Sequence, residues 1–181
     1  FNMGQATRAE WFGTSCCPTN VVRVLPSLPG YVYAVDGPNV FVNHFMAGDA
    51  AFSVGKNKLS VSQKTNYPWS GAVKLTVNPE KPGPLTLRVR IPGWAQNRPV
   101  PGDLYRYENG TSEKISLKIN GQETPLRLEN GFAVLNRTWK RGDVVELELP
   151  MPVRRVVAHE QVAANRGRVA LERGPVVYCV E

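Results

Sequence analysis

From residue 31 onward, apolar and polar residues alternate in short segments that are separated by Gly, Pro, Asn and Asp. A period of two places successive side chains on opposite faces of a β-strand, so each segment can bury only one of its faces. Turn residues between such segments favour antiparallel neighbours. The clearest segments are 31–35, 40–45, 58–63, 73–77, 85–91 and 144–149. The sequence therefore predicts an all-β fold, an antiparallel β-sandwich.

Three stretches mark how these segments are organised. Residues 36–39, Asp-Gly-Pro-Asn, separate the first two segments and predict a β-hairpin. Residues 99–111 interrupt the alternation and predict a long surface loop. Residues from about 152 onward are again strand-like and indicate the start of a second sandwich.

Residues 1–30 differ from the rest, because they lack the period of two. Residues 18–25 predict a short helix with Pro18 near its first turn, where proline is tolerated. Pro26 is expected to kink or end that helix. The change of period at Gly30 therefore divides a short helical segment from the β region.

Two of the chain's three cysteines, Cys16 and Cys17, are adjacent and immediately precede this helix. Neighbouring residues rarely form a disulfide with each other without strain, and three cysteines do not make a disulfide framework. Two adjacent thiols can, however, bind one soft metal ion. The alternative is a buried pair of small apolar residues at the foot of a helix. Cys179 lies in an alternating segment and is expected to pack in the core.

Composition excludes several classes of partner. The 42% hydrophobic and 20% charged residues are typical of globular domains, and no apolar run is long enough to cross a bilayer, so no membrane partner is predicted. The formal net charge of +7 comes without a helix-turn-helix, zinc-finger or RNA-binding signature, so no nucleic-acid partner is predicted. A solvated strand face explains the basic residues, among them Arg88, Arg90, Lys118, Arg127, Arg154, Arg155, Arg166 and Arg168.

The histidines and tryptophans are weaker candidates for a site. His44 and His159 have no second ligand at metal-binding spacing, so we interpret them as structural or surface residues. Trp69, Trp94 and Trp139 have side chains that can stack on sugar rings, but most aromatic residues of a β-sandwich are core or turn anchors.

Residues 15–23, Ser-Cys-Cys-Pro-Thr-Asn-Val-Val-Arg, preceded by Trp-Phe-Gly at 11–13, resemble the cysteine motif of glycoside hydrolase family 127. The resemblance continues in order through the family's C-terminal β region and covers nearly the whole chain. Its further segments are 90–95, 119–121, 131–133, 137–143, 149–154 and 173–178.

The resemblance implies a domain organisation. Members of the family include bacterial β-L-arabinofuranosidases built from an (α/α)6 barrel followed by β-sandwich domains. By this resemblance, residues 1–30 are the C-terminal end of the barrel, residues 31–150 are a β-sandwich domain, and residues 151–181 are a continuing β region that is cut short. Both ends of the chain are expected to be cut, and the missing N-terminal barrel is the expected partner within the same polypeptide.

The resemblance also implies a reaction: retaining hydrolysis that removes β-L-arabinofuranose or a related plant-glycan sugar from a carbohydrate substrate. Cys16 would be the nucleophile and a zinc ligand, and Cys17 would be a second zinc ligand. The remaining ligands, a glutamate and a third cysteine, and the glutamate that acts as general acid/base would lie upstream; Glu10 matches none of them. Zinc favours the thiolate form that a nucleophilic cysteine needs. The chain alone is therefore expected to be inactive.

Two other functions remain open at this point. One is a non-catalytic carbohydrate-binding β-sandwich, which needs an exposed aromatic platform and has no use for the cysteine pair. The other is a structural or interaction module whose cysteines bind metal only to hold the fold. The sequence does not distinguish a cytoplasmic from a periplasmic location, and it leaves the sugar, its linkage and the oligomeric state open.

Overall fold

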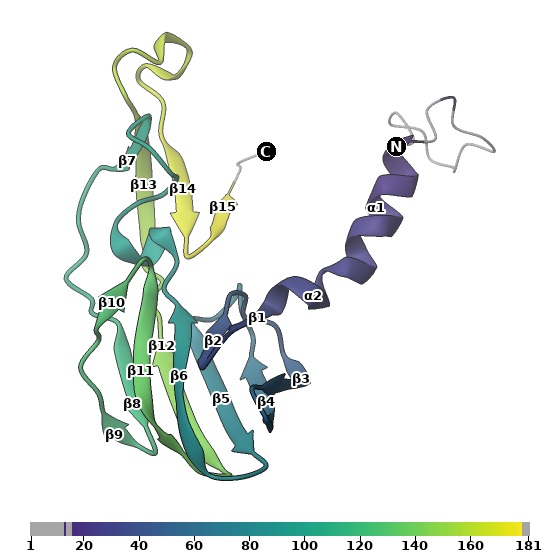
Figure 1. Cartoon of the computed structure of the whole chain (residues 1–181). Coiled ribbons are helices and arrows are strands. Elements are labelled where there is room, and N and C mark those ends of the chain that lie inside the picture. The colour runs from purple at the N-terminus through teal and green to yellow at the C-terminus, as the bar shows by residue number, and fades with distance from the viewer. Residues whose placement is uncertain (1–12, 14–15, 179–181) are drawn as a thin grey trace. The chain divides into compact units, whose positions relative to one another are not determined.

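The computed structural model of the 181-residue chain describes residue 13 and residues 16–178, which divide into two compact units (Figure 1). The first unit ends at Tyr31 and contains helix α1 (Cys16–Ser27). A short helix, α2 (Pro29–Val32), spans the boundary. The second unit begins at Val32 and contains the β-strands, so the chain is mostly β, as the alternating pattern predicts.

Helix α1 forms where the sequence predicts a helix, but with wider bounds. It begins at Cys16 instead of Pro18, and the side chains of Thr19 and Asn20 donate hydrogen bonds of 3.0 Å and 2.8 Å to the Cys16 carbonyl. Pro26 lies inside its last turn, and the helix ends one residue later. A proline this close to a C-terminus removes only one helical hydrogen bond.

The predicted strand at 31–35 also needs correction. Residues up to Val32 are helical, and strand β1 begins at Tyr33. The backbone amide of Tyr31 donates to the Leu28 carbonyl at 3.0 Å, and this turn extends the helical region past Gly30. The period of two therefore starts two residues later than the sequence indicates.

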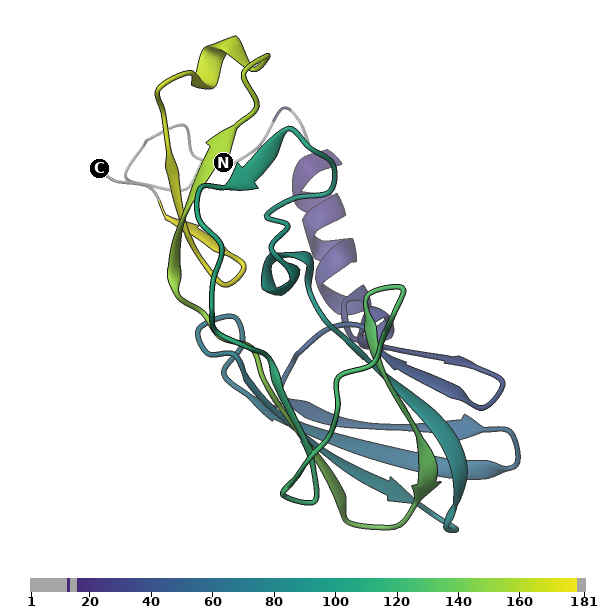
Figure 2. The same cartoon turned by 90° about the vertical axis from the view of Figure 1, so that its left-hand side faces the viewer.

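Two sheets form the layers of the sandwich (Figures 1 and 2). Sheet A has the order β1 (Tyr33–Asp36), β2 (Asn39–Val42), β6 (Gly83–Arg90), β11 (Phe132–Trp139) and β10 (Leu128–Glu129). Sheet B has the order β3 (Gly48–Val54), β4 (Asn57–Thr65), β5 (Ala72–Pro79), β12 (Asp143–Glu148), β8 (Ser116–Ile119) and β9 (Gln122–Glu123).

Sheet C extends the β region beyond this sandwich. It has the order β15 (Val176–Tyr178), β14 (Ala170–Arg173), β13 (Val153–Ala158) and β7 (Tyr105–Tyr107). Short 3-10 helices at Gly93–Gln96 and Ala163–Asn165 lie in the connections. Strand β7 is a correction to the sequence analysis, because it lies inside the predicted surface loop at 99–111.

The predicted hairpin is confirmed, and one pairing differs from the antiparallel expectation. Strands β1 and β2 pair antiparallel from Tyr33 opposite Val42 to Asp36 opposite Asn39. Strand β2 also pairs with β6, and this pairing is parallel. The β1–β2 hairpin therefore joins the edge of a sheet whose remaining neighbours are antiparallel.

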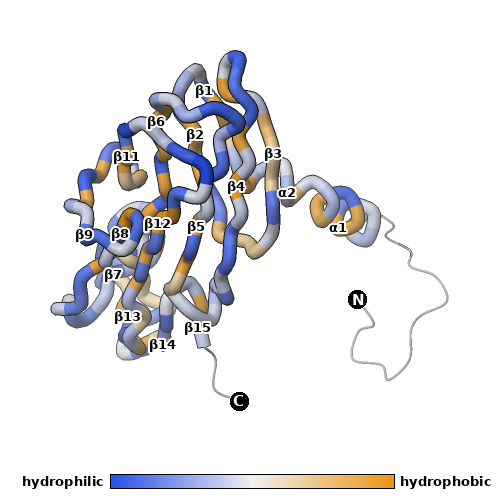
Figure 3. The backbone as a smooth tube through the Cα atoms, turned by 90° about the horizontal axis from the view of Figure 1, so that it is seen from below, coloured by the Kyte–Doolittle hydropathy of each residue, from blue (hydrophilic) through white to orange (hydrophobic). Residues whose placement is uncertain are grey.

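The inward faces of sheets A and B share one hydrophobic core. Trp139 is its largest fully buried side chain, and its indole N–H donates to the Leu85 carbonyl at 3.2 Å. Figure 3 shows hydrophobic segments alternating with hydrophilic ones along strands such as β5 and β12. The buried members from the two sheets include Val40, Val42, Leu59, Val61, Val73, Leu75, Val77, Leu85, Leu87, Val89, Leu135, Val145 and Leu147.

A buried carboxylate closes the turn before β12. Asp143 accepts hydrogen bonds from the Lys140 backbone amide at 2.8 Å and from the Asn120 side chain at 2.9 Å. Burial alone would raise the pKa of Asp143, but these two hydrogen bonds and the nearby cations outweigh it and lower that pKa. The turn is therefore stabilised by the ionised form.

Within the described residues, no helix is both long enough and apolar enough to cross a bilayer.

Candidate functional site

The cysteine pair occupies the first two positions of α1. Both thiols are exposed and free, and their sulfur atoms lie 3.9 Å apart. A disulfide requires an S–S distance of about 2.05 Å, so the two sulfurs are separate groups. Pro18 follows directly and the Thr19 and Asn20 side chains bind the Cys16 carbonyl, which fixes the backbone that carries the pair.

The sulfur separation fits two ligands of one tetrahedral zinc ion. Two Zn–S bonds of about 2.3 Å that meet at the tetrahedral angle put their sulfurs about 3.8 Å apart. Thiolate sulfur is also a preferred donor for zinc. The pair therefore suits one half of a four-coordinate shell.

The other half of such a shell does not come from the residues that the structure describes. Among residue 13 and residues 16–178, no three His, Cys, Asp or Glu side chains are grouped so that they could hold a metal ion. Glu10, which the sequence analysis could not match to a family ligand, lies outside the described residues. A complete zinc site would need donors from elsewhere in the polypeptide.

Both histidines lie in the second unit and make local contacts there. His44 is exposed, and its backbone carbonyl accepts a hydrogen bond from the Gln63 side chain at 3.2 Å. His159 is exposed, and its Nδ1 accepts from the Gln161 backbone amide at 3.2 Å. These local contacts match the interpretation of both histidines as structural or surface residues. Cys179 lies outside the described residues.

Two of the three candidate tryptophans are core anchors. Trp139 is fully buried, and Trp94 is 9% exposed with its indole N–H directed to the Tyr67 hydroxyl at 3.3 Å. Trp69 is different, because 60% of it is exposed. A sugar platform formed by several tryptophans is therefore absent from the described residues, and one exposed indole is left.

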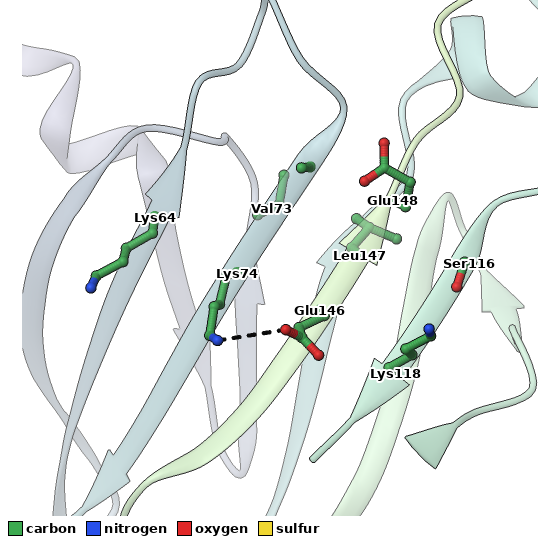
Figure 4. Close-up of a pocket in the computed structure, with 9 residues that line it drawn as sticks. Lys64, Val73, Lys74, Ser116, Lys118, Glu146, Leu147 and Glu148 are labelled. Atoms are coloured by element: carbon green, nitrogen blue, oxygen red, sulfur yellow. Dashed lines mark ion pairs between the residues drawn. The ribbon is translucent and has the colours of Figure 1, made fainter. Parts of the chain in front are cut away.

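An open groove of about 540 Å³ lies on the outer face of sheet B, and Figure 4 shows the side chains that line it. Lys74 and Glu146 form an ion pair of 3.5 Å there. Lys64, Lys118 and Glu148 add further charge. Charges of both signs on exposed strands are typical of a solvated sheet face, so the groove is not a strong candidate for a reactive site.

A buried polar cluster joins β7, β13 and β14, and no pattern in the sequence indicates it. The Tyr107 hydroxyl donates a 2.5 Å hydrogen bond to Glu172, and the Arg154 guanidinium lies 3.3 Å from the centroid of the Tyr107 ring. Arg154 also donates to the Asn97 side chain at 2.9 Å and to the Asn109 carbonyl at 3.0 Å. Arg154 is therefore a half-buried connecting residue, which corrects its assignment to a solvated strand face.

Burial sets the electrostatics of this cluster. It raises the pKa of Glu172, although the Tyr107 hydrogen bond and Arg154 offset part of that effect. Burial also raises the pKa of Tyr107, and its hydrogen bond to Glu172 acts in the same direction. The space between these side chains is about 20 Å³, enough for one water molecule and too small for a sugar. The cluster is a structural joint between strands.

Comparison with families of known proteins gives two matches that together span most of the chain. The model of the middle domain of GH127 β-L-arabinofuranosidase matches residues 39–151. The model of the glycoside hydrolase family 127 C-terminal domain matches residues 153–181. Strand β7 lies in the first matched range and pairs with β13 in the second.

Individual relatives agree with these matches. A non-reducing end β-L-arabinofuranosidase of Bifidobacterium longum subsp. longum is 36% identical over 96% of this chain. The solved structure of the GH127 β-arabinofuranosidase BT3674 is 43% identical over 97% of this chain, with a TM-score of 0.91. That of Ara127N-Se, a GH127 β-L-arabinofuranosidase from Geobacillus stearothermophilus T6, is 38% identical over 98%, with a TM-score of 0.82.

The chain spans about a quarter of the length of these relatives. It covers 24% of the Bifidobacterium enzyme, 27% of BT3674 and 26% of Ara127N-Se.

Proposed function

The chain belongs to glycoside hydrolase family 127, and we propose that it is the C-terminal portion of a retaining β-L-arabinofuranosidase in which Cys16 is the nucleophile. The observation that carries the proposal is the pair of exposed thiols, 3.9 Å apart, at the start of α1. Neither a carbohydrate-binding module nor a structural one gives this pair a catalytic use. The relatives named as β-L-arabinofuranosidases supply the substrate class.

The same pair is the proposed zinc site within this chain. Cys16 and Cys17 would each supply one thiolate, and the remaining ligands would come from polypeptide outside residues 1–181. Bound zinc would keep the sulfurs ionised and make the Cys16 thiolate a better leaving group. Cys17 would act as a ligand only.

Two displacements at the anomeric carbon complete the proposed reaction. In the first, the Cys16 sulfur forms a bond to that carbon while the bond to the departing oxygen breaks and a general acid protonates this oxygen. In the second, the same acid/base group deprotonates a water, which attacks the carbon and breaks the carbon–sulfur bond. Two inversions give net retention. The acid/base group would lie upstream of this chain, as the family resemblance implies.

Membership of glycoside hydrolase family 127 also supports the proposed domain limits. Residues 1–30 would be the end of a catalytic barrel, residues 31–150 a β-sandwich domain, and residues 151–181 a continuing β region. In this arrangement the β domains support the site and the barrel supplies most of the sugar pocket. The chain alone should therefore not hydrolyse aryl β-L-arabinofuranosides. Turnover by the isolated chain that is abolished by Cys16→Ala would contradict this placement of the acid/base group.

The proposal is tested in the full-length protein with three variants of α1. Cys16→Ala should abolish hydrolysis of an aryl β-L-arabinofuranoside and reduce bound zinc, measured by metal analysis. Cys17→Ala should release zinc and lower activity, with the smaller loss because the nucleophile remains. Ser27→Ala, at the other end of the same helix, is the matched control and should change neither measurement. Full turnover by Cys16→Ala, or an intact enzyme without zinc, would contradict the proposal.

A further inference from the structure

The two outer faces of the sandwich differ in composition. The outer face of sheet B carries lysines and glutamates, as Figure 4 shows. One end of the outer face of sheet A carries aromatic, arginine and valine side chains, and polar residues such as Thr86 and Asn136 follow further along it. The register places Phe41 and Val134 opposite Arg88, and Phe132 opposite Arg90, so these five residues share one face. We call Phe41, Arg88, Arg90, Phe132 and Val134 the aromatic–arginine face.

The side chains of this face hold one another in place. The Phe41 and Phe132 rings make an edge-to-face contact with centroids 5.3 Å apart. The Arg90 guanidinium lies 4.5 Å from the Phe132 centroid, and that of Arg88 lies 5.7 Å from the Phe41 centroid. Arg88 also forms an ion pair of 3.1 Å with Glu129. These contacts restrict the conformations that the side chains of this face can adopt.

This composition is that of a protein interface. Interface centres are enriched in aromatic residues and arginine and depleted in lysine and glutamate, whereas solvated faces show the reverse. Side chains that are already ordered lose less conformational entropy on binding. The outer face of sheet B, which carries lysines and glutamates, has instead the composition of a solvated face.

We propose that the aromatic–arginine face is an internal interface of the full-length protein, covered by polypeptide outside residues 1–181 that presents apolar and acidic side chains. This inference rests on the proposal that the chain is part of a longer protein. The chain spans only about a quarter of the relatives' length, so a large part of such a protein is available to cover the face.

Charge and ring contacts favour this occupant over two others. The face and its border carry Arg88, Arg90 and Arg127, and Glu129 pairs with both Arg88 and Arg127. A second copy docked through the same face would set these cations against each other. A sugar would need the free faces of aromatic rings, but Arg88 and Arg90 each cover a face of one ring. A protein surface with acidic and apolar side chains would attract these cations, and it does not need the free faces of the rings.

The test compares two valines in the full-length protein, each changed to cysteine. Val134 lies on the aromatic–arginine face, and Val144 lies half-buried on the outer face of sheet B, opposite Thr76. The rate of thiol alkylation is measured for each by peptide mass analysis, which separates the native cysteines, and is divided by the rate in denaturant. Val134→Cys should react about tenfold or more slower than Val144→Cys. Adding Arg90→Glu should speed the reaction at Val134→Cys and not at Val144→Cys.

Three results would overturn the inference. Equal rates at the two positions would mean that the aromatic–arginine face is open to solvent. Protection of Val134→Cys that disappears on dilution would identify a second copy as the occupant. Protection that appears only when a β-L-arabinofuranoside is added would identify a sugar site. The labelling ratio does not depend on turnover, so it separates failure of this inference from failure of the proposed catalytic role of Cys16.

Discussion

The two units of the chain differ in what they carry: the first has the candidate nucleophile, and the second has the hydrophobic core. The first unit carries the candidate nucleophile, but α1 has no buried residue, and its apolar side chains, such as Val22 at 67%, are exposed. Figure 3 shows these hydrophobic positions along α1. The second unit has a continuous core across two sheets, and its polar cluster around Glu172 has no room for a sugar. The candidate nucleophile and the residues that hold the β fold therefore lie in different parts of the chain.

The physical reason lies in what each unit can bury. A helix of 12 residues is marginal in water on its own, because its nucleation cost is repaid only by tertiary contacts. The second unit buries the alternating faces of long strands against one another, which gives it a core of its own. We therefore expect that truncations in the core of the second unit change stability and that substitutions of the two cysteines of α1 change activity.

The largest expected effect on stability comes from one matched pair of truncations, one in each unit. Trp139→Ala should lower the free energy of unfolding by about 3 to 5 kcal/mol, because it leaves a cavity in the core and removes the hydrogen bond to Leu85. Val22→Ala, at an exposed position of α1, should change it by less than about 0.5 kcal/mol. Urea unfolding of the 181-residue chain measures both. Equal losses at the two positions would break the comparison between the units.

A smaller effect is expected at the joint between strands. Arg154→Ala should lower the free energy of unfolding by about 2 kcal/mol. The substitution removes hydrogen bonds to Asn97 and Asn109 and the cation beside Glu172. Arg155→Ala is the matched control, since that side chain is 64% exposed and makes only a surface ion pair with Glu108. The same urea experiment should show little change for the control. If Arg154→Ala left the free energy of unfolding unchanged, backbone pairing alone would hold sheet C.

The smallest expected effects are on how the stability of the second unit depends on pH, and two buried carboxyl groups act in opposite directions. The raised pKa of Glu172 means that its contribution is fully present below the ordinary value of 4.5 and is lost as pH rises through the folded-state pKa. The lowered pKa of Asp143 means that its contribution is present above the ordinary value of 3.8 and is lost as pH falls through the folded-state pKa.

Each dependence has its own variant. Glu172→Gln should remove the loss of stability that occurs as pH rises above the ordinary pKa of glutamate. The variant keeps an acceptor for the Tyr107 hydroxyl. Asp143→Asn should remove the loss at acid pH. Glu148→Gln, on an exposed strand face, should leave both dependences unchanged. The measurement is the unfolding free energy of each variant at pH values below and above the ordinary pKa values of aspartate and glutamate. If the pH dependence assigned to Glu172 persisted in Glu172→Gln, or that assigned to Asp143 persisted in Asp143→Asn, the assignment would be wrong.

Local patterns predicted much of the fold, and non-local pairings account for what they missed. The Asp-Gly-Pro-Asn turn correctly predicted the β1–β2 hairpin, because its geometry is set by neighbouring residues. Strand β7 was missed, because its three residues lie in a stretch rich in proline and glycine and its partner β13 begins 46 residues after it ends. The parallel pairing of β2 with β6 was missed for the same reason.

In the candidate site, too, local features could be predicted from the sequence and non-local contacts could not. Adjacent cysteines are visible in the sequence, so the pair could be singled out before the structure was known. The role of Arg154 could not, because alternation shows that it shares a face with Val156 but not that the strand opposite places Glu172 beside it. The roles of Cys16 as nucleophile and of Cys16 and Cys17 as zinc ligands remain predictions.

The most direct test of the central claim is to find the atom that carries the sugar during turnover. The full-length protein is quenched while it hydrolyses a β-L-arabinofuranoside whose fast-leaving aryl group lets the glycosyl-enzyme accumulate, and its peptides are analysed by mass. The account predicts one pentosyl group on the peptide that begins α1, attached to Cys16 and absent in Cys16→Ala. A pentosyl group on a carboxylate elsewhere, with turnover retained by Cys16→Ala, would contradict it.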